Sequence, residues 1–552
     1  MIRIQQLKIS IGQYSDDTES TLLLQAAAKR LGVKPVLLEK LPRRIMKKSV
    51  DARDKNDILL VYTLDIDGQG ILNEDMAARK RNVSIVSPAA YAPPAGLTGD
   101  SPPPVVVGAG PAGLLAALVL ARAGLNPILL ERGAPVEARQ TAVQHFWQTG
   151  QLNPAANVQF GEGGAGAFSD GKLTTGIHDP RIAYVLDTFV EMGAPEPIRY
   201  LAKPHIGTDK LTQVVRSLRQ SIIALGGSVR FYSRVTDIGV EAGQITSIRI
   251  ETPGLTYSLP VSDVILALGH SARDTFAMLA QRGLVMEAKP FAVGVRIEHS
   301  QRWLNELQYG RYAGHPALGA TDYKLHAPTR DGRGCYTFCM CPGGYVVAAA
   351  SEAGRLAVNG MSYYNRAGQN ANSALLVGVT PADYAPSARA AGADEGVSPA
   401  LYGIYLQQSL EEAAFQLGGG NFHAPVQLAG DFLAGQASNA LGSVEPSYRP
   451  GVRLTDLRLC LPEFVTDGLR EGLRDIERRL PGFAAPDAVL TAVESRSSSP
   501  VRLLRGTSLE GSIGGLFPCG EGAGYAGGIM SAAVDGVRCA EKVIDTNSRL
   551  TR

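Results

Sequence analysis

The segment from residue 105 to residue 131 constrains the fold of this chain more than any other part of the sequence. Three valines lead into the pattern GAGPAG at 108–113, and an apolar helix is predicted over 114–123. A second apolar strand follows at 127–130 and ends at Glu131. This strand–turn–helix–strand order predicts a Rossmann-like unit that binds a dinucleotide.

Each glycine of the pattern has its own physical reason. Gly108 permits a tight turn, Gly110 lets the backbone approach a pyrophosphate, and Gly113 lets the helix pack closely on the strand. The free N–H groups at the start of the helix then attract the phosphates. Glu131 is placed to accept hydrogen bonds from both ribose hydroxyls of an adenosine. This acid favours FAD or NAD over NADP, whose ribose carries a 2′-phosphate.

Two later segments favour FAD. Residues 227–269 are predicted to form a strand, a short antiparallel meander and an apolar strand that returns to the nucleotide sheet. Near the C-terminus, an apolar strand ends in Gly520-Glu521, and Gly527-Gly528 open a helix predicted over 530–544. The start of that helix is expected to face the flavin N1–C2=O edge, which becomes negative on reduction. This order resembles the FAD-binding members of the glutathione-reductase-type superfamily, which usually have Gly-Asp where this chain has Gly-Glu.

Further stretches narrow the resemblance. They are the glycine-dense loop 160–173, the segments 335–344, 351–352 and 358–362, and Ser49–Arg53 near the N-terminus. Together they resemble the bacterial family of uncharacterised FAD-dependent dehydrogenases, over nearly the whole chain. The resemblance implies bound FAD and the fold of the superfamily, and it implies no particular reaction.

The predicted fold class is α/β. A two-dinucleotide-type FAD-binding Rossmann-like domain carries an inserted substrate-capping domain and follows a small N-terminal α+β domain. The predicted boundaries are 1–95 for the small domain, 96–104 for a proline-rich linker, 101–285 with 500–552 for the FAD-binding domain, and 286–499 for the cap. Proline removes backbone donors and fixes φ, so the linker spaces two domains and joins no sheet.

Within the small domain, an amphipathic helix is predicted over 18–31, ended by Gly32. Strands are predicted over 2–9, 35–38 and 58–66. The stretch 43–55 is basic, and it is interpreted as a solvated face or an inter-domain contact, with an RNA or anionic-partner surface as the alternative. A mobile loop is predicted over 385–396, which is rich in alanine, proline and glycine.

Composition excludes several classes of protein. The chain has 552 residues, of which 45% are hydrophobic and 19% charged, which rules out global disorder. A net charge of +2 indicates neither nucleic acid nor an acidic membrane as partner. No apolar run is long enough to span a membrane, and the N-terminus lacks a secretory pattern. Six cysteines in a chain of this size indicate no disulfide framework, so a cytoplasmic location is expected.

The residues predicted to bind FAD lie in the three motifs and in the glycine-dense loop. They are Gly108, Ala109, Gly110, Pro111, Ala112, Gly113, Glu131, Arg132, Arg139, Gly163, Gly164, Gly166, Phe168, Ser169, Lys172, Val235, Ala267, Gly269, Gly520, Glu521, Ala526, Gly527, Gly528 and Ile529. Ser169 and Lys172 are candidate donors to flavin oxygens or phosphate, and ordinary loop residues are the alternative. Arg496 and Arg502 are candidates to hold an anionic substrate.

Cys335, Cys339 and Cys341 have a spacing that matches neither zinc nor iron–sulfur motifs, so no metal site is expected. They are interpreted as core or loop cysteines near the substrate cavity, and the alternative is a redox pair that faces the flavin. His178 and His270 are interpreted as structural.

We therefore expect an FAD-dependent oxidoreductase, a dehydrogenase or reductase, that acts on a small-molecule substrate and binds FAD non-covalently. No second strand–GxGxxG–helix unit is present, so hydride comes from the substrate or from transiently bound NAD(P)H. The alternatives are a flavin-containing RNA- or partner-binding protein, whose basic first domain docks a macromolecule, and a flavin monooxygenase. No membrane or nucleic-acid partner is expected. The sequence indicates no catalytic acid or base, no substrate and no oligomeric state.

Overall fold

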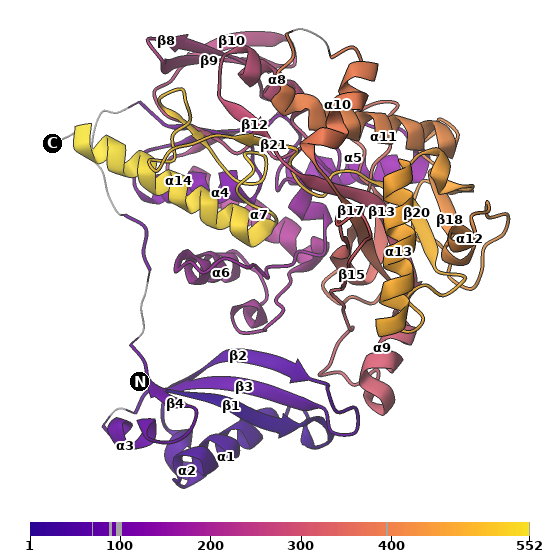
Figure 1. Cartoon of the computed structure of the whole chain (residues 1–552). Coiled ribbons are helices and arrows are strands. Elements are labelled where there is room, and N and C mark those ends of the chain that lie inside the picture. The colour runs from indigo at the N-terminus through magenta and orange to yellow at the C-terminus, as the bar shows by residue number, and fades with distance from the viewer. Residues whose placement is uncertain (69, 88–90, 95–101, 394–395, 551–552) are drawn as a thin grey trace.

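The computed structural model describes residues 1–68, 70–87, 91–94, 102–393 and 396–550 of the chain. Figure 1 shows a small N-terminal sheet domain below two larger units, one that contains the C-terminal helix and one built on a large mixed sheet. Residues 96–101 of the predicted linker lie outside the described residues. Among the residues that the structure describes, no helix is both long and apolar enough to cross a membrane.

The first domain is a four-stranded antiparallel sheet with helices on one face. Its elements are β1 (Ile2–Ser10), α1 (Glu19–Leu31), α2 (Pro35–Glu39), β2 (Arg43–Asp51), β3 (Leu59–Ile66), α3 (Glu74–Ala78) and β4 (Val83–Ile85). The strand order β2-β3-β1-β4 is that of a split βαβ arrangement. Alternate residues of β1 and β3, among them Ile4 and Tyr62, share one buried core with α1. As predicted, α1 ends at Gly32, whose φ of 73° is left-handed.

Two predictions of local structure are wrong. Residues 35–38 were expected as a strand, but they begin helix α2 with Pro35 in its first turn, where a missing N–H costs nothing. The first half of the expected loop 385–396 belongs to helix α10 (Pro381–Ala390). Asp383 starts this helix by accepting hydrogen bonds from the backbone N–H and the hydroxyl of Thr380 at 2.8 and 2.9 Å. This capping interaction outweighs the loop-forming composition of the segment.

The first domain contacts the rest of the chain on two sides. The Lys48 N–H of β2 donates to the Tyr200 carbonyl at 2.7 Å, and the Ala202 N–H donates to the Lys48 carbonyl at 2.9 Å. On the other side, Tyr309 and Leu318 from the large mixed sheet unit join the buried core of the first domain. Part of the basic stretch is therefore an inter-domain contact, which is one of the two interpretations given above.

The nucleotide-binding half is built on a five-stranded parallel sheet. Its strands are β5 (Val105–Val107), β6 (Ile128–Leu130), β7 (Ser228–Arg230), β11 (Val264–Leu266) and β22 (Leu516–Pro518), in the order β22-β11-β5-β6-β7. Such sheets are buried on both faces, which explains their unbroken valine, leucine and isoleucine runs. Helix α4 (Pro111–Arg122) is apolar all round because it packs between this sheet and the C-terminal helix α14 (Ile529–Leu550).

The predicted meander is confirmed. It consists of β8 (Arg234–Glu241), β9 (Gln244–Thr252) and β10 (Leu255–Pro260), which pair antiparallel. The chain then returns as β11, which lies between β5 and β22 in the parallel sheet. The motif strand, the returning strand and the C-terminal strand are therefore neighbours, and their carboxyl ends share one edge.

The large mixed sheet lies between β11 and β22 in the sequence. Its strands are β13 (Phe291–Ser300), β14 (His326–Ala327), β15 (Cys335–Ala348), β16 (Val358–Met361), β17 (Asn370–Val379), β18 (Ala424–Leu428), β19 (Val452–Leu454) and β20 (Val489–Glu494). Helices α11 (Tyr402–Gly418) and α13 (Glu463–Arg479) contribute to its apolar core. The central strands β13 and β17 are buried at nearly every position, so any charged side chain in them needs a partner.

Candidate functional site

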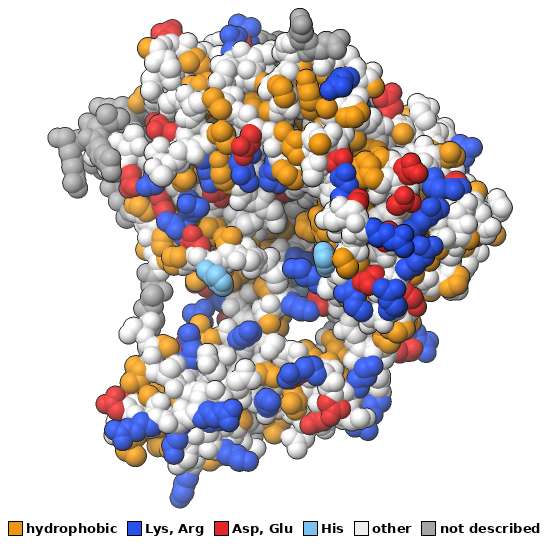
Figure 2. All heavy atoms as spheres, in the orientation of Figure 1, with side chains coloured by type: hydrophobic (Ala, Val, Ile, Leu, Met, Phe, Trp, Pro, Cys, Tyr) orange, Lys and Arg blue, Asp and Glu red, His pale blue; other side chains and the backbone are white. Residues whose placement is uncertain are grey.

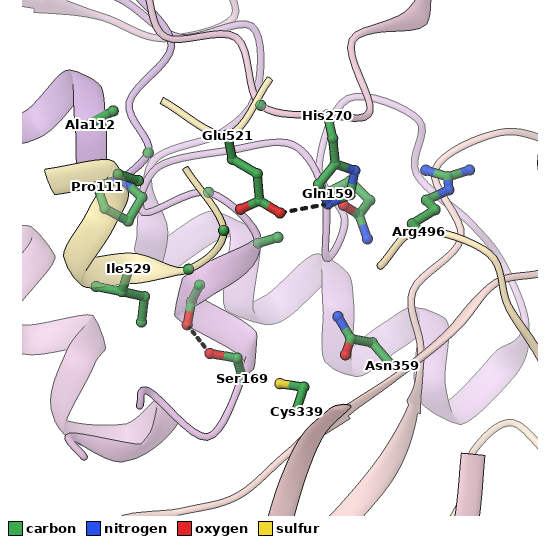
Figure 3. A pocket seen from close by; sticks show the side chains of 18 of the residues that line it. Pro111, Ala112, Gln159, Ser169, His270, Cys339, Asn359, Arg496, Glu521 and Ile529 are labelled. Carbon is green, nitrogen blue, oxygen red and sulfur yellow. Dashed lines mark hydrogen bonds and ion pairs between the residues drawn. The ribbon is translucent and has the colours of Figure 1, made fainter. Parts of the chain in front are cut away.

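One cavity of about 830 Å³ is lined by both the nucleotide-binding half and the large mixed sheet. Open parallel sheets bind ligands at the carboxyl edge of their strands, and this cavity includes that edge. Figure 3 shows Pro111 and Ile529 on one side of it and Cys339 and Asn359 on the other. The predicted residues that line it are Gly108, Gly110, Pro111, Ala112, Glu131, Arg132, Gly164, Gly166, Ser169, Lys172, Val235, Ala267, Gly269, Glu521, Gly527, Gly528 and Ile529.

The glycine turn leaves space for a ligand at Gly110. An added Cβ at Gly113 would lie 1.8 Å from the Gly108 carbonyl oxygen, and one at Gly108 would lie 2.3 Å from that of Ala267, so packing requires both glycines. At Gly110 the nearest atom to an added Cβ is the Gly164 Cα, at 3.9 Å. Gly110 also precedes the first turn of α4, whose N–H groups have no partner within the helix. The open volume and the free donors together fit a pyrophosphate.

The Glu131 carboxylate accepts hydrogen bonds from both the glycine turn and the glycine-dense loop. One carboxylate oxygen accepts a hydrogen bond from the Ala109 N–H at 2.8 Å, and the other accepts from Gly133 at 2.8 Å and Gly161 at 3.0 Å. The side chain is 5% exposed and lines the cavity at the end of β6. Its position fits the expected ribose contact, and the acid also organises the backbone around that contact.

The structure places Arg139 beneath the glycine-dense loop and outside the cavity. Its fully buried guanidinium donates to the carbonyls of Asn157, Val158, Glu162 and Gly164 at 2.7–2.9 Å. Direct contact of Arg139 with the cofactor was predicted, and the observed role is to hold the loop that borders the cavity. Six other predicted residues also do not line it: Ala109, Gly113, Gly163, Phe168, Gly520 and Ala526. They lie in the glycine turn, in the glycine-dense loop and after the C-terminal strand, next to residues that do line the cavity.

Glu521 points into the cavity toward His270, and its carboxylate oxygen lies 3.9 Å from the His270 Nε2 (Figure 3). Burial, with a smaller contribution from Cys339, raises the pKa of Glu521 to about 7. Burial and the nearby Arg496 lower the pKa of His270 to about 3, so this histidine is neutral. Glu521 is therefore the acid of the cavity that titrates near neutrality, and the sequence indicated it only as a cofactor contact. His178, by contrast, is exposed outside the cavity lining.

Replacing Glu521 by glutamine is expected to remove a pH-dependent loss of stability. Below the ordinary pKa of 4.5 the carboxyl is protonated in both the folded and the unfolded chain. As pH rises from there to about 7, only the unfolded chain ionises, so the wild type loses stability relative to the variant and then levels off. Urea denaturation of FAD-stripped protein at pH 5 and pH 8 measures this change, which we expect to be about 1–2 kcal/mol. Glu287→Gln, at an exposed site, is the control, and an equal difference at both pH values for Glu521→Gln would contradict the prediction.

Buried ion pairs form much of the cavity wall next to the large mixed sheet. Arg296 of β13 is fully buried and donates to Glu494 of β20 at 2.8 Å, and Arg366 donates to the buried Asp170 at 2.6 Å. Sequence reasoning assigned no role to Arg296, Arg366 or Asp170, although Arg366, Asp170 and Glu494 line the cavity. An arginine within the apolar run of β13 and a glutamate ending that of β20 were the available indication, because each requires a buried partner.

Of the two arginines predicted to hold an anionic substrate, Arg496 lines the cavity. Arg496 donates two hydrogen bonds to the buried Glu411 carboxylate, both at 2.8 Å, and further ones to Ser271 and Ser351. Its charge and four of its five N–H donors therefore already have partners within the protein. Arg502 does not line the cavity.

Lys172 and Lys324 are the two lysines of the cavity lining that remain available to a ligand, and Lys172 is the less exposed of the two. The ammonium group of Lys172 has no ion pair or side-chain hydrogen bond with any residue that the structure describes. Ser169, the other candidate donor in this loop, gives its hydroxyl proton to the Gly166 carbonyl at 2.8 Å. An unpaired ammonium group in the lining of a cavity fits an anionic group on the cofactor or the substrate.

The cysteines do not form a three-thiol cluster. Cys335 is buried next to Gly472 of α13, whereas Cys339 lines the cavity. Within the described residues, the one His/Cys/Asp/Glu group close enough to surround a metal ion is Cys519, Asp535 and Cys539. Both oxygens of Asp535 already accept hydrogen bonds from Arg505, at 2.7 and 2.9 Å, so the charge of that carboxylate is neutralised by the arginine.

Comparison with known proteins agrees with this description. Residues 103–144 match the model of an FAD binding domain, residues 290–497 match the C-terminal domain-like model of FAD-dependent proteins, and residues 1–67 match a domain of unknown function. An uncharacterized protein of Clostridium beijerinckii is 45% identical over 554 residues, covering 99% of this chain and 98% of its own.

Among solved structures, the E. coli quinol fumarate reductase FrdA aligns with 83% of this chain and 71% of its own at 11% identity and a TM-score of 0.35. The halogenase PltM aligns with 81% of this chain and 70% of its own at 11% identity and a TM-score of 0.36.

The Rossmann-like sheet, the open position at Gly110 and the matched FAD binding domain define an FAD-binding flavoprotein of the α/β class. The chain belongs to the family of FAD-dependent proteins that includes the C. beijerinckii relative, with which it aligns over almost its full length.

Proposed function

We propose that this flavoprotein is an oxidoreductase that acts on a small molecule bound between FAD and the large mixed sheet. The observation that carries the proposal is that Gly110, at the pyrophosphate turn, and Asn359, on the mixed sheet, line the same cavity. When bound there, FAD supplies two-electron chemistry. The space beside the mixed sheet is then left for a substrate.

The residues of this chain supply binding and proton handling. Glu131 and the first turn of α4 bind the adenosine and pyrophosphate ends, and Glu521 holds or gives a proton with a pKa of about 7. Lys172 orients an anionic group. The electron donor in the proposal is the substrate itself or a transiently bound NAD(P)H, and the compartment is the cytoplasm.

A small-molecule substrate is favoured over RNA because the Lys and Arg side chains of the first domain are scattered over the face that Figure 2 shows, and Arg44, Lys48 and Arg53 of the basic stretch pair with carboxylates. Lys48 donates to Glu19 at 2.6 Å, and Arg53 donates to Asp51 at 2.6 Å. The Lys48 side chain is only 16% exposed, so its charge is not free to bind a phosphate backbone. A monooxygenase is distinguished by experiment, since it would form peroxide from NADPH and oxygen when no substrate is present.

The purified protein is expected to be yellow, and heat or acid should release FAD and no FMN, which chromatography of the released flavin resolves. Under argon, NADH, NADPH and a metabolite panel are then mixed with the protein, and loss of flavin absorbance is followed. We expect one donor class to bleach the flavin in wild type and to act more slowly on Lys172→Met, with Lys210→Met as the matched surface control. A protein that carries FAD but is reduced by no donor in the panel would count against the proposal.

A further inference from the structure

A β-bulge turns Cys339 out of the sheet and into the cavity. In the pairing of β15 with β17, Phe338 lies opposite Ala374 and Cys341 lies opposite Asn372, so β15 carries one extra residue between them. Cys339, within the bulge, has a φ of 43°, an uncommon left-handed value for a residue other than glycine. Bulges next to binding sites commonly re-aim a side chain. Figure 3 shows the resulting direction, with the Cys339 thiol pointing toward Ser169.

The charges around the bulge favour a thiolate at Cys339. The fully buried Arg296 donates to the Cys339 carbonyl at 3.0 Å, and the unpaired Lys172 lines the same cavity. The thiol of Cys341 lowers the pKa of Cys339 by hydrogen bonding, and the charges of Arg296 and Lys172 lower it further, against the effect of burial. Thiols with a lowered pKa in partly exposed sites are the reactive ones.

Cys341 follows two residues after Cys339 on the same strand. Its thiol is buried, and its Sγ lies 3.3 Å from the Cys339 carbonyl oxygen. Hydrogen bonding to Cys339 and burial both raise the pKa of Cys341, so it stays protonated while its neighbour is ionised. An accessible thiolate in front of a buried protonated thiol is the arrangement of an attacking and a resolving cysteine.

The other cysteines lack this environment. Cys335, Cys460, Cys519 and Cys539 are buried. Burial alone raises the pKa of Cys335 to about 12, and its thiol is next to Gly472 of α13. Cys335 is therefore a matched control on the same strand.

We propose that Cys339 and Cys341 form a redox-active dithiol pair in the cavity whose substrate is a small disulfide. The proposal deepens the oxidoreductase function and rests on it for the return of the pair to its reduced form. A disulfide takes up two electrons, which is the number that FAD carries.

The chemistry balances in two steps. The Cys339 thiolate attacks one sulfur of the substrate disulfide, forms a mixed disulfide and releases one substrate thiolate. Cys341 then loses its proton to that thiolate and attacks the Cys339 sulfur, which forms the Cys339–Cys341 disulfide and releases the second half of the substrate as a thiolate. The substrate gains two electrons and the pair loses two. Two electrons and one proton would return the pair to its thiolate and thiol form, and bound FAD would supply this two-electron chemistry, with reduced nicotinamide as the electron source.

A thiol count tests the pair without relying on flavin reduction. The FAD-containing protein is mixed with 5,5′-dithiobis(2-nitrobenzoate), and the released nitrothiobenzoate is measured over time. We expect wild type to release about two equivalents rapidly, because the resolving thiol displaces the second half of the probe. Cys341→Ser should release about one equivalent and keep the other half as a mixed disulfide, visible by mass spectrometry. Cys339→Ser should show no rapid release, and Cys335→Ser should behave as wild type.

Rapid release from Cys339→Ser would overturn the proposal, and so would a single equivalent from wild type that Cys341→Ser leaves unchanged. Each variant is first checked for bound FAD and an unchanged melting temperature, and Cys341→Ala replaces the serine variant if the latter does not fold. Failure of the two functions is distinguishable. The expected thiol count would support the dithiol pair even if no donor reduces the flavin. The absence of flavin reduction would then refute the oxidoreductase function alone.

Discussion

Replacing Gly110 by valine is expected to give a folded but colourless protein. The nearest atom to an added Cβ is 3.9 Å away, so a side chain fits the protein itself. The same side chain would occupy the volume where the pyrophosphate must approach the backbone. We expect FAD affinity to fall by at least about 100-fold, a free-energy loss of about 3 kcal/mol. Flavin absorbance after purification and titration of FAD into the stripped protein measure the loss.

The contrast with Gly113→Ala makes the test specific. There the added Cβ would lie 1.8 Å from the Gly108 carbonyl oxygen, so this smaller change should damage the packing of α4 on β5 and lower the melting temperature. A Gly110→Val protein that purifies yellow with a normal FAD content would show that the phosphate site lies elsewhere.

Replacing Glu411 by glutamine is expected to destabilise the protein by about 3–5 kcal/mol, because it leaves two buried guanidinium groups short of a counter-charge. Glu411 of α11 is fully buried and accepts from Arg273 at 2.8 and 2.9 Å and from Arg496 at 2.8 Å. The two arginines hold the pKa of Glu411 far below its ordinary value, so the carboxylate is charged throughout the accessible range. Urea denaturation at pH 7 measures the loss.

Glu352→Gln is the matched control, because Glu352 accepts from the same Arg273 at 2.7 Å but its side chain is 25% exposed. Its effect should be below about 1 kcal/mol, as for other solvent-screened pairs. Equal losses in the two variants would mean that the buried position of Glu411 confers no special stability.

The nucleotide-binding sheet could be predicted from the sequence because its constraints are local. The turn at Gly108 and the close contact at Gly113 each require glycine, and the parallel strands require unbroken apolar runs. The pattern therefore specifies the strand, the turn and the helix together. The strand over 35–38 failed for the opposite reason, since a short apolar run has no period that separates helix from strand.

The cavity wall next to the large mixed sheet could not be predicted in the same way. Arg296 and Glu494 meet only because β13 and β20 are neighbours in that sheet, and no spacing in the sequence encodes this. Arg496 was assigned to a substrate from its type alone, and its partner Glu411 is on a helix far away in the chain. Cys339 faces the cavity because of a bulge, and a bulge leaves no mark on the alternation of a strand as buried as β15.

Because Tyr309 and Leu318 pack into the core of the first domain, that core cannot be completed until both residues have been synthesised. The strands of that domain have been synthesised once residue 85 is added, but its apolar interior lacks these two side chains until residue 318 has been added. At about 5–20 residues per second, that interval lasts on the order of ten seconds or more. The nascent chain therefore carries an unfinished N-terminal core through much of its translation, and chaperones have that time to act on it.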